Sequence, residues 1–412
     1  MLVSVPLPEP KRADDLRAAA GDEAIDRLKA AAEPFAGARI VHISSTAFGG
    51  GVAELLNTQI ALLQDLGIDA EWQLMEGSEE FFAVTKLVHN ALQGAGVPWT
   101  EAMETTYLDR VAVNAARFDA SADFVFVHDP QPAAMLTFLE EQGRRSGKWV
   151  WRCHIDLSQP MEAVWGFFAL HVARYDAAVF TTEGFVRPGL PIRSAIIPPA
   201  IDPLAPKNTL LDDDAVTEIL RGYSIDARRP IVTQVSRFDP WKDPLGVIDA
   251  YRIARERIPD LQLVMVGSMA HDDPEGWHYL ERTEEHRAGD PDIHILTNLQ
   301  GVGDVAVNAF QRASQVVVQK SLREGFGLTA SEAMWKERPV IAGNVGGLRL
   351  QVEEGVTGHL VDSVEECAER MIGLLEDEEL RDKMGRAGRQ RVQERFLTPR
   401  EVQDYLEVLT EL

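Results

Sequence analysis

The sequence predicts an α/β protein made of two doubly wound, Rossmann-like domains. The chain has 412 residues, short apolar β-branched runs alternate with longer helical stretches, and a proline-rich segment interrupts this alternation near the middle. Short strands separated by helices are typical of βα units around a parallel sheet. At about 100 to 200 residues per domain, the length allows two or three domains.

The first series of elements follows a charged, alanine-rich start. Residues 11–36 alternate charge with alanine, and we expect one or two surface helices there, before the core. Strands are expected at Arg39–Ile43, Glu71–Met75, Phe124–Val127, Trp149–Arg152, Ala177–Thr181 and Ser194–Ile197. Helices are expected at Val52–Leu66, Glu79–Leu92 and Thr100–Phe118.

The second series begins after Ile196–Pro206 (IIPPAIDPLAP). Its four prolines remove amide donors and disfavour helix, so we expect a linker or hinge. Strands are expected at Pro230–Val235, Leu261–Val266, Ile293–Leu296, Gln315–Gln319 and Pro339–Ala342, and helices at Pro244–Arg257, Val305–Arg312, Leu328–Lys336 and Glu365–Glu376. Ligands of such open sheets bind at the carboxyl ends of the strands.

Composition excludes several classes of partner. Forty-one Lys and Arg against 65 Asp and Glu give a net charge of −24, which argues against nucleic-acid binding and against docking on an anionic membrane. No apolar run is long enough for a transmembrane helix, and the start MLVSVPLPEPKRADD lacks the apolar stretch of a secretory signal. Two cysteines cannot form a disulfide framework, so we expect a cytoplasmic protein.

A glycine run lies between a predicted strand and a predicted helix. Ser45–Val52 reads STAFGGGV. Three glycines allow the backbone to approach a ligand closely, and a helix N-terminus attracts anions. A tight turn without a ligand explains the run equally well, and its spacing does not fit G-x-G-x-x-G.

Two cations follow the first strand of the second series. Arg237 and Lys242 stand in VSRFDPWKD. An Arg fork and a Lys point charge at the carboxyl end of a strand suit a diphosphate. A pair of surface salt bridges is the alternative interpretation.

The segment Glu324–Glu332 (EGFGLTASE) carries two acids around a glycine-containing helix start. The amides of residues 325–328 are expected to face an anion or a polar ligand. Carboxylates accept hydrogen bonds from sugar and ribose hydroxyls. The alternative is an acid favoured by the helix dipole together with a solvated glutamate.

Polar side chains also follow two strands of the first series, in His128–Pro130 and Arg152–Asp156. No HExxH motif or close set of His and Cys accompanies them, so we expect no metal site. Cys153 lacks an activating base and is expected to be structural. Residues Glu76–Gln93 either line a pocket or form an amphipathic helix with a polar face.

Together, these residues resemble the retaining GT-B glycosyltransferases of family four. The pairs Arg237/Lys242 and Glu324/Glu332 match that family's donor-site motifs in order and spacing, and the resemblance covers roughly residues 38–396. The strings HISSTAFGGGVAELL, HDPQP, WRCHIDLS, QVSRFDPWKD, VGSMAHDDPEGW and REGFGLTASEAMWK closely resemble trehalose glycosyltransferring synthases. Those enzymes make α,α-trehalose from a nucleoside-diphosphate glucose (ADP-, UDP- or GDP-glucose) and free glucose.

The resemblance implies a role for each donor-site residue. Arg237 and Lys242 would hold the diphosphate and stabilise the leaving group, Glu332 would bind the ribose, and Glu324 would bind the glucose near its 3- and 4-hydroxyls. The amides of Gly325, Phe326, Gly327 and Leu328 would meet the sugar and the distal phosphate. Many members of the family have glycine after the Lys, whereas Asp243 stands here, so the resemblance does not extend to the geometry of this loop.

The resemblance implies further roles in the first series. His154 would meet the donor sugar near its 6-hydroxyl and the acceptor, and the Gly49–Gly51 loop, with Gly50 and Gly51, would pass over the diphosphate. The residues expected in the acceptor pocket are Lys86, Asn90, His154 and Asp156.

The family's architecture implies an acceptor-binding domain at 1–202, a donor-binding domain at 203–396, and a last helix at 397–412 that returns to the first domain after a crossing near Phe396–Pro399. It also implies same-face transfer with retention, no required cofactor or metal, at most stimulation by a divalent cation such as Mg²⁺, and a homodimer. Three alternatives stay open: a trehalose phosphorylase, a sugar-nucleotide epimerase of the same fold, and a non-catalytic sugar- or nucleotide-binding regulator.

Overall fold

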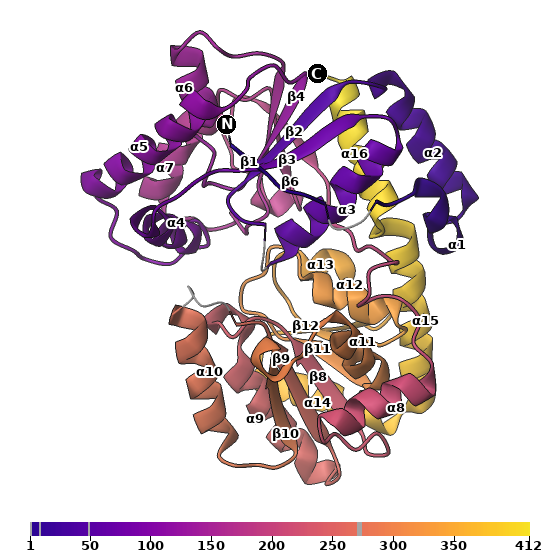
Figure 1. Cartoon of the computed structure of the whole chain (residues 1–412). Coiled ribbons are helices and arrows are strands. Elements are labelled where there is room, and N and C mark those ends of the chain that lie inside the picture. Colours follow the sequence, from indigo (N-terminus) through magenta and orange to yellow (C-terminus); the bar gives the residue numbers. More distant parts are fainter. Residues whose placement is uncertain (1, 8–9, 48–49, 270–273) are drawn as a thin grey trace. The chain divides into compact units, whose positions relative to one another are not determined.

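The computed structural model describes residues 2–7, 10–47, 50–269 and 274–412, and the chain divides into two compact units (Figure 1). Unit 1 consists of Met1–Pro199 and Thr398–Leu412, and unit 2 of Ala200–Leu397. The division falls inside the proline-rich segment and directly before the last helix. Each unit contains one sheet with helices on both faces.

Unit 1 has a seven-stranded sheet. Its strands are β1 (Val3–Ser4), β2 (Arg39–Ser44), β3 (Asp69–Leu74), β4 (Phe124–His128), β5 (Lys148–Arg152), β6 (Ala177–Phe180) and β7 (Arg193–Ile196). Its helices are α1 (Arg17–Ala20), α2 (Asp22–Ala32), α3 (Gly51–Asp65), α4 (Glu79–Leu92), α5 (Glu101–Arg117), α6 (Met135–Glu141), α7 (Glu162–Val172) and α16 (Thr398–Thr410). The strand order is β1-β3-β2-β4-β5-β6-β7, and every pair except β1–β3 is parallel.

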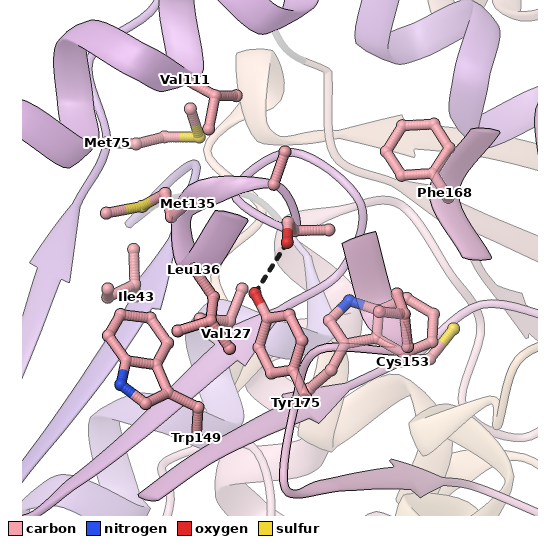
Figure 2. Packing of buried hydrophobic residues seen from close by; sticks show 14 of the residues in the cluster. Ile43, Met75, Val111, Val127, Met135, Leu136, Trp149, Cys153, Phe168 and Tyr175 are labelled. Atoms are coloured by element: carbon pink, nitrogen blue, oxygen red, sulfur yellow. Dashed lines mark hydrogen bonds between the residues drawn. The ribbon is translucent and has the colours of Figure 1, made fainter. Parts of the chain in front are cut away.

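Side-chain alternation along the strands divides the core of unit 1 into two layers. In β4, Val125 and Val127 pack under α4 to α7, whereas Phe126 packs under α2, α3 and α16, because successive strand residues point to opposite faces. Figure 2 shows the first layer, in which the buried Tyr175 donates from its hydroxyl to the Ala133 carbonyl at 2.8 Å.

Helix α2 belongs to the second layer of this core. Ile25, Leu28 and Ala32 are buried on one face of the helix, which packs against α16. Helix α2 is thus a surface helix, as expected, and one face of it belongs to the core because its alanine-rich sequence carries an apolar stripe at helical spacing.

Unit 2 has a six-stranded, fully parallel sheet. Its strands are β8 (Ile231–Val235), β9 (Gln262–Gly267), β10 (Ile293–Thr297), β11 (Val316–Gln319), β12 (Val340–Gly343) and β13 (Gly358–Val361). Its helices are α8 (Asp213–Gly222), α9 (Pro244–Arg257), α10 (Pro274–Arg287), α11 (Asp304–Ala313), α12 (Leu328–Trp335), α13 (Leu348–Gln351), α14 (Val364–Glu376) and α15 (Glu378–Arg395). Helices α9 and α14 cover one face, and α8 and α11 cover the other.

The strand order of each sheet reverses once along the chain. In unit 2 the order is β10-β9-β8-β11-β12-β13, so the reversal lies between β8 and β11; in unit 1 it lies between β2 and β4. Loops at the carboxyl ends of the two strands diverge at such a point and leave a crevice where open α/β sheets bind ligands. A ligand site is therefore expected at the carboxyl edge of each sheet, at the reversal point.

None of the helices in the described part of the chain combines the length and apolar character needed to cross a bilayer.

Candidate active site

The loops after β8 and β11 meet at Lys242 and Glu324, at the reversal point of unit 2. Lys242 Nζ lies 2.6 Å from Glu324 Oε2, and the Leu322 amide donates to the Trp241 carbonyl at 2.7 Å. The Glu324 side chain is only 9% exposed and that of Lys242 15%, so a surface salt bridge is the wrong interpretation for Lys242.

Glu324 is held through one of its two oxygens. Gln319 Nε2 and Ser321 Oγ each donate to Oε2 at 3.0 Å, beside Lys242. Burial disfavours the charged form, but the Lys242 charge and these hydrogen bonds together lower the pKa of Glu324. The group is therefore an ionised carboxylate at neutral pH, and its Oε2 already accepts from Lys242, Gln319 and Ser321. No residue of the described segments donates to Oε1.

Asp239 connects the two cations of the loop. Its Oδ2 lies 3.0 Å from an Arg237 guanidinium nitrogen, and its Oδ1 accepts the Lys242 amide at 3.1 Å. The Asp239 side chain is almost fully buried, whereas that of Arg237 is 47% exposed. A rigid carboxylate thus orients an Arg that reaches solvent.

The segment 325–328 forms the start of α12. Gly327 has φ 85°, a conformation that favours glycine. Gln351 Nε2 donates to the Phe326 carbonyl at 2.5 Å, and no residue in the described part of the chain accepts from the amides of 325–328. Gly347 permits close packing below this segment, since a Cβ there would lie 2.5 Å from the Gly325 carbonyl oxygen.

Glu332 lies inside unit 2. Its side chain is 2% exposed, and its Oε1 lies 2.9 Å from Lys207 Nζ. Burial opposes ionisation, but the charges of Lys207 and Lys336 lower the pKa of Glu332. The alternative interpretation of a solvated glutamate is therefore wrong.

Asp243 has a structural role at the position where glycine is common. Its φ is 47°, its Oδ1 accepts the Gly246 amide at 3.2 Å as the cap of α9, and its Oδ2 accepts from Lys320 Nζ. Asp tolerates the left-handed region better than most residues. The loop is therefore held by an ion pair as well as by backbone conformation.

In unit 1, Gly50 and Gly51 connect β2 to α3. Gly50 precedes the helix with φ 134°, which again favours glycine, and Gly51 is the first helical residue. Gly49 lies outside the described residues.

His154 lies at the carboxyl edge of the unit 1 sheet, just after β5. Its amide donates to Asp129 Oδ1 at 2.8 Å, and its Nε2 lies 3.0 Å from Nδ1 of His128. Burial and the nearby Arg152 charge hold the pKa of His154 well below its ordinary value. The imidazole is therefore neutral at physiological pH.

The residues expected in the acceptor pocket lie on two segments of unit 1. Lys86 and Asn90 are one turn apart and half-buried on α4, whose other face packs into the core. Asp156 is buried and accepts the Ser158 amide at 2.8 Å. The buried Cys153 donates from Sγ to the Ile155 carbonyl, and burial raises the pKa of its thiol well above the usual value, as expected for a structural cysteine.

Sequence reasoning missed several residues that support these groups. They are His42, Lys207, Asp239, Gln319, Lys320 and Ser321. Asp239 stands inside the quoted VSRFDPWKD, and Ser321 stands two residues before REGFGLTASEAMWK, so their place in the sequence could have indicated a supporting role. Lys207 and Lys320 find their partners only through the tertiary fold.

Comparisons with known proteins identify the family of the chain. Residues 42–187 match the family model for the N-terminal domain of trehalose synthase, and residues 216–391 match that for group 1 glycosyl transferases. A trehalose synthase of Thermococcus litoralis is 47% identical over 404 residues and 97% of each chain. One from Rubrobacter xylanophilus is also 47% identical, over 98% of each chain.

Solved structures share the fold. One is a UDP-forming α,α-trehalose-phosphate synthase from Burkholderia xenovorans in complex with glucose-6-phosphate. It aligns with a TM-score of 0.74 at 13% identity, and the alignment covers 91% of this chain and 100% of the synthase chain. The predicted GT-B class, with two Rossmann-like units, is confirmed. Because the chain is 47% identical to two such enzymes over nearly its full length, it belongs to the trehalose synthase family of GT-B glycosyltransferases.

Proposed function

We propose that the protein transfers glucose from a nucleoside-diphosphate glucose to free glucose, giving α,α-trehalose reversibly and with retained configuration. The observation that carries the proposal is the pair formed by Lys242 and Glu324, 2.6 Å apart at the reversal point of unit 2. It combines a cation suited to a diphosphate with an anchored carboxylate suited to sugar hydroxyls.

The donor sugar would use the part of Glu324 that the protein leaves unoccupied. Three donors fix Oε2, so Oε1 is the oxygen that would accept from the glucose 3- and 4-hydroxyls. The amides of 325–328 would donate to sugar oxygens and to the distal phosphate, since a helix N-terminus favours negative charge.

The diphosphate would be bound by Arg237 and Lys242. Asp239 already orients Arg237, so little side-chain entropy would be lost when the guanidinium binds a phosphate. As the bond to the sugar breaks, negative charge grows on the departing phosphate, and both cations would stabilise it more strongly in the transition state. Glu332, held by Lys207, would accept from the ribose hydroxyls.

Unit 1 would supply the remaining contacts. His154 would meet the donor sugar near its 6-hydroxyl and the incoming glucose, and Gly50 and Gly51 would allow the backbone to approach the diphosphate. Lys86, Asn90 and Asp156 would bind the hydroxyls of the acceptor.

The stereochemistry follows from the linkages. The donor is α-linked and both linkages of trehalose are α, so the configuration is retained. Double displacement would need a carboxylate on the far face of the sugar, and we assign none. We therefore favour same-face attack, in which the departing phosphate oxygen takes the proton from the acceptor hydroxyl and the protein supplies orientation and charge stabilisation.

The test incubates the full chain with glucose and, in turn, ADP-, UDP- and GDP-glucose, and measures nucleotide release together with the disaccharide formed. The proposal predicts equal amounts of nucleoside diphosphate and α,α-trehalose. A parallel incubation replaces the nucleotide sugar with α-glucose 1-phosphate; trehalose formation there, with phosphate released, would indicate a phosphorylase. An epimerised nucleotide sugar without added glucose would indicate an epimerase, and no turnover at all would indicate a regulator.

A variant pair tests the diphosphate contact. Arg237→Ala is expected to reduce turnover about 10²- to 10³-fold, the usual cost of removing one preorganised charge stabiliser. Arg228→Ala is the matched control, because Arg228 is 89% exposed, pairs with Asp226, and precedes β8 at the opposite edge of the sheet. Near-normal turnover in Arg237→Ala would remove Arg237 from the site.

A further inference from the structure

Three histidines in contact through their ring nitrogens connect the carboxyl edge of the unit 1 sheet to its interior. Nδ1 of His42 lies 3.0 Å from Nε2 of His128, and Nδ1 of His128 lies 3.0 Å from Nε2 of His154. Adjacent rings are nearly parallel, at 20° and 18°, with both centroid distances 5.3 Å. We call this set the histidine triplet. Its members come from β2, β4 and the segment after β5, which are neighbours in the sheet.

The triplet consists of neutral rings. Burial lowers the pKa of His42 to about 3. Burial, with the neighbouring histidines and Arg152, also holds the pKa of His128 well below its ordinary value. A neutral imidazole carries one N–H donor and one bare nitrogen acceptor. Each contact between two rings therefore needs a proton on one side only.

The connectivity then restricts the tautomers. Both contacts join Nδ1 of one ring to Nε2 of the next. If His154 carries its proton on Nε2, His128 must accept on Nδ1 and carry its own proton on Nε2. His42 must then accept from His128 on Nδ1 and also carry its proton on Nε2. If His42 carries its proton on Nδ1, all three rings carry it there. Any mixed arrangement leaves a contact with two protons or with none.

We propose that His42 and His128 are positioning residues that fix the tautomer of His154, so that all three rings share one tautomer. With the proton on Nε2 throughout, Nδ1 of His154 is an acceptor; with the proton on Nδ1 throughout, it is a donor. Within the described residues Nδ1 of His154 has no hydrogen-bond partner, and the side chain is partly exposed. The triplet thus decides what His154 offers to a ligand.

The inner end of the triplet faces a small cavity. His42 Nε2 and the Tyr405 hydroxyl are buried and lack a partner among the described residues, and both side chains line a cavity of about 10 Å³ between the sheet and α16. The rest of the lining is mostly apolar, so the inner end of the triplet is closed off from other hydrogen-bonding groups.

Long-range ¹⁵N–¹H NMR of the ¹⁵N-histidine-labelled full chain at neutral pH tests this directly, because it reports which nitrogen of each ring is protonated. The chain has 10 histidines, and single substitutions assign the three signals. One tautomer in all three rings, on Nε2 or on Nδ1, is the expected result. Different tautomers within the triplet would overturn the proposal.

Two variants of His42 test the coupling. His42→Leu removes the group that contacts His128, whereas His42→Asn keeps an amide near the position of Nδ1. His42→Leu is expected to change the tautomer populations of His154, because Nε2 of His128 loses its partner. His42→Asn is expected to change them less, because the amide can still meet that nitrogen. An unchanged His154 tautomer in folded His42→Leu would contradict the coupling.

The catalytic consequence rests on the proposed contact of His154 with the sugar. Turnover in His42→Leu should fall roughly three- to tenfold, the value of one neutral hydrogen bond, and should recover in His42→Asn. Coupled tautomers with unchanged turnover would refute the role of His154 in the reaction and leave the coupling intact. A general packing defect would not be rescued by asparagine.

Discussion

Replacing Asp243 with asparagine removes one charge from the loop that carries Lys242 while preserving its shape. Asn tolerates the left-handed conformation at φ 47° and can still cap α9 through the Gly246 amide. What is lost is the charge opposite Lys320, whose side chain is only 6% exposed. The substitution therefore isolates the ion pair between Asp243 and Lys320.

The expected loss follows from the burial of the pair. Removing one partner of a buried ion pair costs about 3–5 kcal/mol, because the other charge is left buried without compensation. Asp243 is 21% exposed, and an asparagine oxygen still accepts a hydrogen bond, so we expect Asp243→Asn to lower the local opening free energy by about 2–3 kcal/mol. Lys320→Met should cost less, since the remaining carboxylate keeps its place at a helix N-terminus. The double variant should be more stable than additivity predicts, by about 1–3 kcal/mol.

Native-state hydrogen exchange of the full chain is the suitable assay. It reports local opening free energies in β8 and β11, which a single unfolding curve of a two-unit protein does not resolve. Asp226→Asn is the control, because its partner Arg228 is exposed and such a pair is worth about 0–1 kcal/mol. If Asp243→Asn behaved like this control, or if the double variant were additive, the ion pair would not hold the loop.

Three further predictions concern pH, packing and metal. Burial raises the pKa of Glu401 from 4.5 to about 7 against the charges of Arg400 and Arg152, so the folded chain binds more protons than the unfolded chain in this range. The contribution of Glu401 to stability is present below about pH 4.5 and is lost as the pH rises through 7. The free energy of unfolding, measured with urea, should therefore fall by roughly 3 kcal/mol between about pH 5 and about pH 8, and Glu401→Gln should abolish this fall. Gly347→Ala would place a Cβ 2.5 Å from Phe326 Cα and should reduce turnover roughly 10- to 100-fold, whereas Gly373→Ala, whose Cβ meets nothing within 4 Å, should not. Because Arg237 and Lys242 supply the positive charge, a chelator should leave turnover within about threefold of its untreated value; loss of most activity would show a metal requirement.

Regular elements were predictable where the sequence marks their ends. The helices Glu79–Leu92 and Pro244–Arg257 have the predicted bounds, since Ser78 caps the first and Pro244 begins the second. Helix α7 was missed because EAVWGFFALHV is apolar on most sides and has little periodicity. The last helix begins at Thr398, within one residue of the predicted start at 397, since Pro399 is acceptable in the first turn of a helix.

The motif residues could be found in the sequence, but the supporting residues that lie far from the motifs could not. Lys242 and Glu324 are recognisable because they follow predicted strands, where a cation suits a diphosphate and a carboxylate suits sugar hydroxyls. The contact of Lys207 with Glu332 depends on how the segment after Pro199 folds over α12. The histidine triplet joins β2, β4 and the segment after β5, and nothing in the sequence around a strand residue such as His42 indicates a partner on another strand.

The most direct measurement of the central claim is ¹³C NMR of one reaction, with the donor glucose labelled at its anomeric carbon and unlabelled glucose as acceptor. The proposed chemistry predicts that the label appears in α,α-trehalose, in an α linkage, as nucleoside diphosphate is released in equal amount. Label in a β-linked product, in free glucose alone, or in an isomerised nucleotide sugar would contradict it.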